Sequence, residues 1–262
     1  MSRKQIRWIV AALALGLVAL AGIAQAEVVQ KGTIRVQFDG QLTPKKLPRS
    51  GMKPVKVSVA AKIAPTNPKA PDPQMTRMSF EINKFGVLDQ TGLPVCDYEE
   101  IQPATTSDAL AVCRKSLVGE GRFTANVPDS GRSPFPADGK LYAFNGEIDG
   151  KPAVLAHVYG VRPAPVSFTL AFLIGHAKGK FGTSLSVDLP KSTGGGYITG
   201  ISLDLFKTFS SHGKKRSFIS ASCPAPKGFP SASFAFAKAS FAFVGGKNLT
   251  STLNRTCKVS GK

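Results

Sequence analysis

The sequence has 262 residues, with 34 Lys and Arg against 16 Asp and Glu, and it contains only 3 His, 4 Cys and 1 Trp. The hydrophobic content of 42% excludes a disordered polycation, because that many apolar residues can form a buried core. Three histidines leave almost no ligands for a multi-histidine metal centre, and the net charge of +18 favours polyanionic partners without identifying one.

Residues 1–26 have the three parts of a secretory signal peptide. Basic residues come first, the uncharged apolar run Trp8–Ile23 follows, and Ala24-Gln25-Ala26 is a small-x-small cleavage site. The alternative is an uncleaved anchor, but a run of 16 residues is shorter than the roughly 20 that span a bilayer. We therefore expect a secreted, extracytoplasmic protein with a net charge of +15, no Trp and no transmembrane segment after cleavage.

Apolar and polar residues alternate through the mature chain, which predicts strands with one buried face. The alternating sets are Ile34, Val36 and Phe38; Val55, Val57 and Val59; Met78, Phe80 and Ile82; Phe123, Ala125 and Val127; Val166, Phe168, Leu170, Phe172 and Ile174; Thr183, Leu185 and Val187; and Ile201, Leu203 and Leu205. Asp149-Gly150 predicts a type I′ turn between strands at 140–148 and 152–160, since both turn positions need positive φ.

One helix is predicted near 106–118. Thr105-Thr106-Ser107 offers N-cap side chains, and Asp108 lies in the first turn. Leu110, Cys113 and Leu117 are spaced as a buried stripe, and Gly119 is expected to end the helix.

The segment 233–243, SFAFAKASFAF, contains a short repeat. Phe234 and Phe236 have one parity and Phe241 and Phe243 have the other, so an unbroken strand would place the two pairs on opposite faces. We expect a bulge or turn at Ala237–Ala239 that returns both pairs to the core. The alternative is an exposed aromatic strip for a ligand.

These patterns predict an all-β fold: a jelly-roll-like β-sandwich of about a dozen antiparallel strands with one short helix. We expect a single domain over 27–262, with two smaller β-domains as the alternative.

Cys96, Cys113, Cys223 and Cys257 all lie in the mature chain, and an even number of cysteines in an exported protein predicts disulfides. Four cysteines allow three pairings. We favour Cys96–Cys113 and Cys223–Cys257 because each closes a short loop. A metal centre would need CxxC pairs or nearby histidines, so no metal and no other cofactor is expected.

Positive charge concentrates at the two ends of the mature chain. Residues 27–69 carry 9 basic and 2 acidic side chains, 70–188 carry 11 and 13, and 189–262 carry 11 and 1. If the first and last strands are neighbours, they form a cationic face; the alternative is dispersed, solubilising charge. The strongest members of the predicted basic patch are Arg35, Lys45, Lys46, Arg49, Lys214, Lys215 and Arg216.

No catalytic residue is predicted. His157 lies in a predicted strand, and a role as general base would need a partner such as Glu147 or Asp149 across the hairpin. We interpret it as a structural histidine. The acidic cluster Asp97, Glu99 and Glu100 fits no Ca²⁺ loop with fixed ligand positions and is interpreted as a solvated turn.

Several segments together resemble a family of exported bacterial proteins of unknown function. They are LPVC (93–96), ALAVCRKSLVGEG (109–121), FTANV (123–127), SPFPADGKLYAFNG (133–146) and CPAPKGFPSASFAFAKASF (223–241). The resemblance implies a bacterial source and supplies no activity.

The leading hypothesis is a non-enzymatic secreted or envelope-associated protein that binds an anionic cell-wall polymer, or another envelope component, through a basic face. Dedicated nucleic-acid binding is not expected, because the mature chain has no Trp and no recognisable nucleic-acid-binding module. Two alternatives stay open: an extracellular hydrolase on a jelly-roll scaffold, and a structural surface or coat protein.

Overall fold

The computed structural model describes residues 26–129, 132–160, 166–189 and 196–260. The predicted signal peptide, apart from Ala26, lies outside these residues. No helix in the described part of the chain is long and apolar enough to cross a membrane.

Strands make up most of the fold. In chain order they are β1 (Glu27–Lys31), β2 (Ile34–Thr43), β3 (Lys46–Leu47), β4 (Lys53–Pro54), β5 (Lys56–Pro65), β6 (Met75–Asn83), β7 (Gly86–Leu88), β8 (Cys96–Asp97), β9 (Leu117–Asp129), β10 (Arg132–Ile148), β11 (Lys151–Gly160), β12 (Val166–His176), β13 (Phe181–Asp188), β14 (Tyr197–Leu205), β15 (Thr208–Ser211), β16 (Lys214–Ser217), β17 (Ile219–Ala221), β18 (Ser231–Phe243) and β19 (Lys247–Val259). The helices are α2 (Tyr98–Ile101), α3 (Thr106–Cys113) and the 3₁₀ turn η1 (Arg114–Ser116).

One 14-stranded sheet contains both the first and the last strand. Its order is β1-β2-β5-β14-β9-β10-β11-β12-β13-β6-β18-β19-β3, with β8 paired to β10. Neighbours are antiparallel except for the pairs β3–β19 and β8–β10, which are parallel. A three-stranded sheet (β4-β17-β7) and the β15–β16 hairpin lie outside it.

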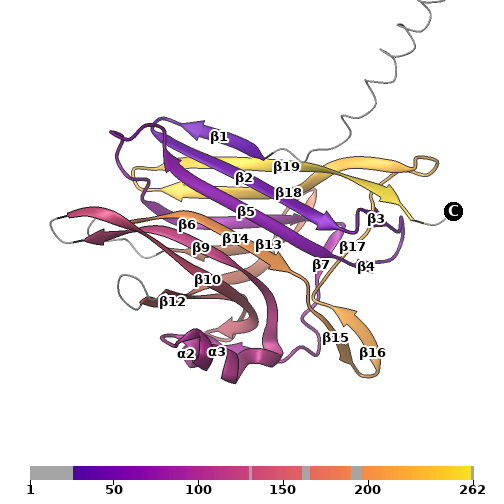
Figure 1. The fold of residues 1–262 in the computed structure, drawn as a ribbon. Helices are drawn as coiled ribbons and strands as arrows, with labels where there is room; N and C mark the ends of the chain where they lie inside the picture. The colour runs from indigo at the N-terminus through magenta and orange to yellow at the C-terminus, as the bar shows by residue number, and fades with distance from the viewer. Residues whose placement is uncertain (1–25, 130–131, 161–165, 190–195, 261–262) are drawn as a thin grey trace, which may run out of the picture.

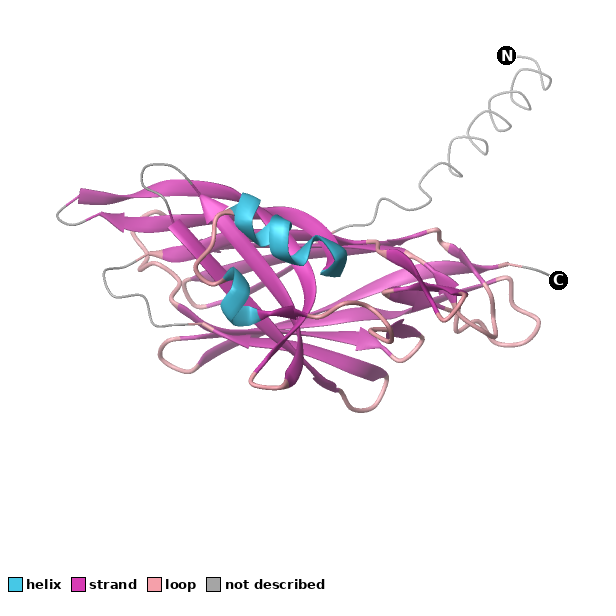
Figure 2. Ribbon diagram, turned by 90° about the horizontal axis from the view of Figure 1, so that it is seen from below, coloured by secondary structure: helices cyan, strands magenta, loops and turns pink. Residues whose placement is uncertain are grey.

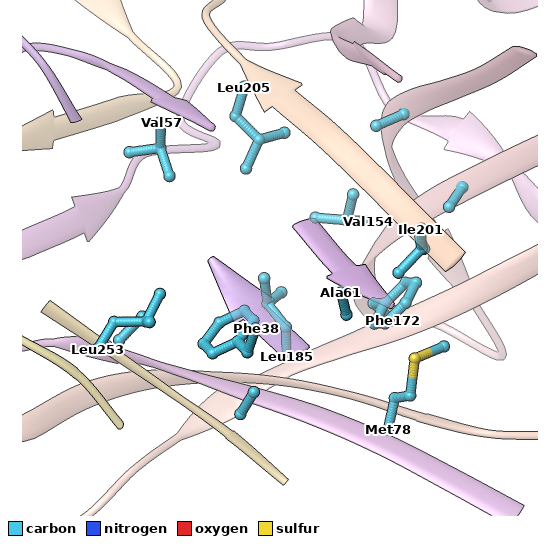
Figure 3. Close-up of a cluster of buried hydrophobic side chains, with 14 of the residues drawn as sticks. Phe38, Val57, Ala61, Met78, Val154, Phe172, Leu185, Ile201, Leu205 and Leu253 are labelled. Atoms are coloured by element: carbon cyan, nitrogen blue, oxygen red, sulfur yellow. The ribbon is translucent and has the colours of Figure 1, made fainter. Parts of the chain in front are cut away.

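The large sheet curls until its two ends meet, so that β1 and β2 lie against β19 (Figure 1). Apolar side chains from the two facing halves fill the space between them, as Figure 3 shows for Phe38, Met78, Phe172 and Leu253. The rings of Phe38, Phe80, Phe172 and Phe241 contact one another with centroids 5.9–6.5 Å apart. The predicted all-β fold is therefore confirmed, and its two facing layers belong to one continuous sheet.

Both helices pack on the outer side of the sheet, against β10–β12 (Figure 2). The side chain of Thr105 caps α3 and accepts a hydrogen bond from the Asp108 amide, as the sequence predicts. The helix is shorter than the predicted 106–118, because it passes into η1 after Cys113 and β9 begins at Leu117. Asp97 of the acidic cluster caps α2, which the sequence analysis did not predict.

The hairpin signals hold in the structure. Asp149 and Gly150 have φ angles of 52° and 68°, and β10 pairs with β11 on either side of them. In β18 the pairing with β19 shifts at Phe236, just before the predicted bulge site. As a result Phe236, Phe241 and Phe243 are all buried in the core, and Phe234 packs against it, which supports the packing interpretation of the repeat.

Candidate functional site

Both predicted disulfides are present. Cys96–Cys113 joins β8 to the end of α3, and Cys223–Cys257 joins the segment after β17 to β19. Two disulfides are consistent with an extracellular location, because oxidising compartments let them persist. The Cys96 and Cys113 sulfurs lie near the Glu100 carboxylate, but in a disulfide they are not thiolate ligands.

The seven residues predicted as a basic patch fall into three groups. Arg35 lies near the start of β2, whereas Lys45, Lys46 and Arg49 follow its end, about 30 Å away at ~3.3 Å per residue. Lys214, Lys215 and Arg216 lie in β16, whose hairpin projects away from β3 (Figure 1).

Two of these seven have structural partners. Arg216 forms a 2.7 Å salt bridge with Asp89, and Arg49 donates to the carbonyl oxygens of Ala225 and Phe229. Burial alone would raise the pKa of Asp89, but the hydrogen bond from the Thr91 amide and the Arg216 guanidinium outweigh it and lower that pKa. Arg216 and Arg49 are thus tied to their own chain.

The two basic ends of the chain do lie together. We define the terminal seam as β1, β2, β3 and β19, the strands at the meeting ends of the sheet. Its strands carry six basic residues, Lys31, Arg35, Lys46, Lys247, Arg255 and Lys258, against two acidic ones, Glu27 and Asp39. The first and last strands are neighbours, which was the condition for a cationic face.

Most cations of the terminal seam have no salt-bridge partner in the described part of the chain, and the same holds for cations elsewhere in the fold. In the described part of the chain, Arg255 is the one seam cation in a salt bridge, with Asp39. The other five salt bridges belong to Lys56, Arg77, Arg122, Arg216 and Lys238. Lys46 and Lys258 are exposed and occupy paired positions of β3 and β19, so two like charges lie side by side. Like charges in paired positions repel, and an anion between them would relieve that cost.

The seam cations gather at its two ends. Lys46 and Lys258 are at one end, next to Lys45 just before β3, whose carbonyl accepts a hydrogen bond from the Lys258 amide. Lys31 and Arg35 are at the other, together with Lys247, whose Nζ approaches the turn at Gly32. An extended polyanion could contact both ends, whereas a small anion could contact only one.

A groove of about 620 Å³ lies between β12 and β13. Tyr98, Phe123, Phe168 and Tyr197 contribute aromatic side chains to it. The rings of Phe123 and Phe168 contact edge to face, with centroids 5.0 Å apart. Burial and the nearby Asp72 carboxylate raise the pKa of Tyr197 above its ordinary value, while a hydrogen bond with Asn126 opposes this effect.

The polar residues of the groove include Asp149, Lys151, and the Arg77–Asp188 salt bridge at 2.7 Å. Their formal charges cancel, so the groove lacks the cationic excess of the terminal seam. The groove could not be predicted from the sequence because its parts come from distant segments; Arg77 and Asp188 are 111 residues apart. No local pattern signals where two strands of a sheet separate.

His157 lies outside the groove. It is fully buried beneath α2, and its Nδ1 is 3.4 Å from Thr169 Oγ1, which in turn donates to the carbonyl of Ile101. Burial lowers the pKa of His157, although hydrogen bonding to the Ile101 backbone opposes this effect. The imidazole is buried and does not line the groove, and its Nε2 has no hydrogen-bond partner in the described part of the chain, so it contacts no acid or base, which supports the structural interpretation. The hydrolase alternative would therefore depend on carboxylates such as Asp149 and Asp188 in the groove.

No known protein family, curated protein or solved structure matches the chain. The resemblance to exported bacterial proteins of unknown function stays a prediction, and the function is argued below from the surface itself.

Proposed function

We propose that this is an exported, non-enzymatic protein that binds an anionic polymer of the bacterial cell envelope along the terminal seam. The observation that carries the proposal is that the two basic chain ends lie side by side in the terminal seam. Five of the six seam cations form no salt bridge in the described structure. The leader-like residues 1–26, the two disulfides and the net charge of +15 without the leader support it.

A polymer is a better fit than a small anion because the basic residues lie at both ends of the seam. A chain of repeating negative charges could contact Lys31 and Arg35 at one end and Lys46 and Lys258 at the other. Such contacts between exposed charges are individually weak and add up only when several form together. We therefore expect binding to grow with polymer length and to weaken as ionic strength rises.

The test is retention of the chain 27–262 on a bacterial cell-wall preparation at low and high salt. We expect retention at low salt, release at high salt, and loss of retention when the anionic polymers are first extracted from the wall. Charge reversal by Lys46→Glu with Lys258→Glu should lower the bound fraction at least tenfold at low salt. The matched control, Lys115→Glu with Lys140→Glu, makes the same charge change at exposed positions outside the seam.

A second pair, Lys214→Glu with Lys215→Glu, separates the seam from the β16 hairpin. If the hairpin variant loses binding and the seam variant keeps it, the polymer binds at the hairpin and the seam assignment is wrong. Absence of retention by the unmodified chain at low salt would overturn the proposal altogether, since added salt can only weaken an electrostatic contact.

A further inference from the structure

The backbone pairing between β12 and β13 covers only the last part of β12. β12 pairs with β11 from Val166 to Leu173, but it pairs with β13 only from Leu173 to His176. The last partner in β13 is Ser186, so Val187 and Asp188 are paired to β6 alone. Beyond this point the two strands separate, and the groove of about 620 Å³ lies between them.

The hydrogen bonds at the ends of the two strands show which backbone groups face the groove. The Ala177 amide donates to the Gly182 carbonyl across β12 and β13, and the Leu189 amide donates away from β12, to Thr76. Successive residues of a strand direct their N–H and C=O groups to alternate sides. The backbone groups of Thr169, Ala171 and Asp188 therefore point into the groove.

These edges have no ladder partner in the described part of the chain. Within the described residues, the groove-facing N–H and C=O groups of Thr169 and Ala171 form no strand pairing and no other backbone hydrogen bond. An unpaired strand edge is a template for another strand. The edge from Ser167 to Ala171 spans five residues, or about 17 Å at ~3.3 Å per residue, which matches a short peptide segment.

Side chains on the two sides of this edge differ in character. Phe168 and Leu170 point toward the core, where Phe123 and Ile198 complete an apolar floor. On the outer side the lining is mixed: Tyr98, Ile148 and Leu173 lie beside polar groups that include Lys151 and the Arg77–Asp188 salt bridge. A strand lying in the groove would place alternate side chains on the apolar floor and the rest against this mixed outer lining.

We propose that the groove between β12 and β13 accepts an extended peptide of about five residues, with apolar side chains at alternate positions, as an added strand on the edge of β12. An acyl chain could cover the apolar floor, but it would leave the N–H and C=O groups of Thr169 and Ala171 without partners. A peptide backbone supplies those partners, and the apolar floor selects its side chains. This site is separate from the terminal seam, and the proposal does not depend on the polymer.

The probe is a phage-displayed library of random heptapeptides, selected on the immobilised chain 27–262. We expect enrichment of peptides with alternating apolar residues. A selected peptide made synthetically with N-methyl groups on the amides that face β12 should bind at least tenfold more weakly than the unmodified peptide, because the donors are removed while the side chains stay. The comparison needs no change to the protein.

Amide hydrogen exchange of the protein gives a second, residue-level readout. Binding should slow exchange at the Ala171 amide at least tenfold and leave the Leu173 amide unchanged, since Leu173 already pairs with β13. Ala171→Pro removes the edge donor and should weaken binding about tenfold, because proline is tolerated where a strand N–H faces outward. No enriched peptide, equal binding of the N-methylated form, or unchanged exchange at Ala171 would overturn the proposal.

Discussion

Arg255 in the last strand binds Asp39 in the second strand, 216 residues away in the sequence. Its Nη2 donates to Asp39 Oδ1 at 2.8 Å and its Nε donates to the Gly40 carbonyl at 2.6 Å. The Arg255 side chain is 10% exposed and that of Asp39 is 46% exposed, so the guanidinium is shielded from water while the carboxylate is half-exposed. One guanidinium thus joins the two ends of the curled sheet.

Replacing Arg255 by Lys should lower the free energy of unfolding by about 1–3 kcal/mol, because an ammonium group cannot make both directed hydrogen bonds. Urea denaturation measures the change. The control is Arg122→Lys, whose partner Asp138 is exposed. This control should change stability by less than about 1 kcal/mol. Equal effects at the two sites would contradict a closing role for Arg255.

Removing the Cys223–Cys257 disulfide by Cys223→Ser with Cys257→Ser should destabilise the fold more than removing Cys96–Cys113. The bridges close loops of 34 and 17 residues, which correspond to about 4 and 3 kcal/mol in the chain-entropy account. The Cys223–Cys257 disulfide, which closes the longer loop, also joins β19 to the segment after β17. Thermal unfolding of the two double variants without reductant measures the order, and the reverse order would contradict this account.

Gly121→Ala should destabilise the protein by about 2 kcal/mol or more. A Cβ added at Gly121 would overlap the Ser202 carbonyl oxygen of β14, so two paired strands would have to move apart. Gly160→Ala is the matched control, because there the nearest atom, the Asp138 carbonyl oxygen, is 3.7 Å away. Urea midpoints of the two variants test the difference, and similar midpoints would show that β9 and β14 adjust easily.

Stability should fall as the pH drops below about 6.5, in part because of His157. Burial lowers the pKa of His157 in the folded protein below its ordinary value of 6.5, so the unfolded chain binds a proton that the folded chain does not. The loss reaches about 1.4 kcal/mol per pH unit and ends at the lowered folded pKa.

The variant His157→Gln should remove that part of the pH dependence, and His212→Gln, at an exposed position, should leave it in place. Urea denaturation between pH 7.5 and about pH 4.5 measures the slope of stability for each variant. An unchanged slope in His157→Gln would show that this imidazole charges in the folded state.

Local patterns predict much of this fold. The Asp149-Gly150 turn, the Thr105 cap and the alternating strands follow from the conformational preferences of a few neighbouring residues. The break of register in β18 was also predictable, because buried phenylalanines of opposite parity require one.

The arrangement in space was not predictable in the same way. Nothing near Leu173 or Ser186 in the sequence shows that β12 and β13 separate there, since the break depends on how far each strand follows its other neighbour. The charge distribution suggested that the chain ends could share a face, but the contact of β1 with β19 required the full strand order. The grouping of the predicted basic residues follows from that order as well.

The contact of the first strands with the last also sets an order of events in folding. Asp39 can meet Arg255, and Cys223 can meet Cys257, only after synthesis has passed residue 257. Until then both edges of the sheet are open and the phenylalanine core is uncovered, a state that is slow to resolve and prone to aggregate. Closure of the curled sheet is therefore a late step in folding that requires β19. A chaperone that protects the incomplete chain would have to bind it before β19 pairs.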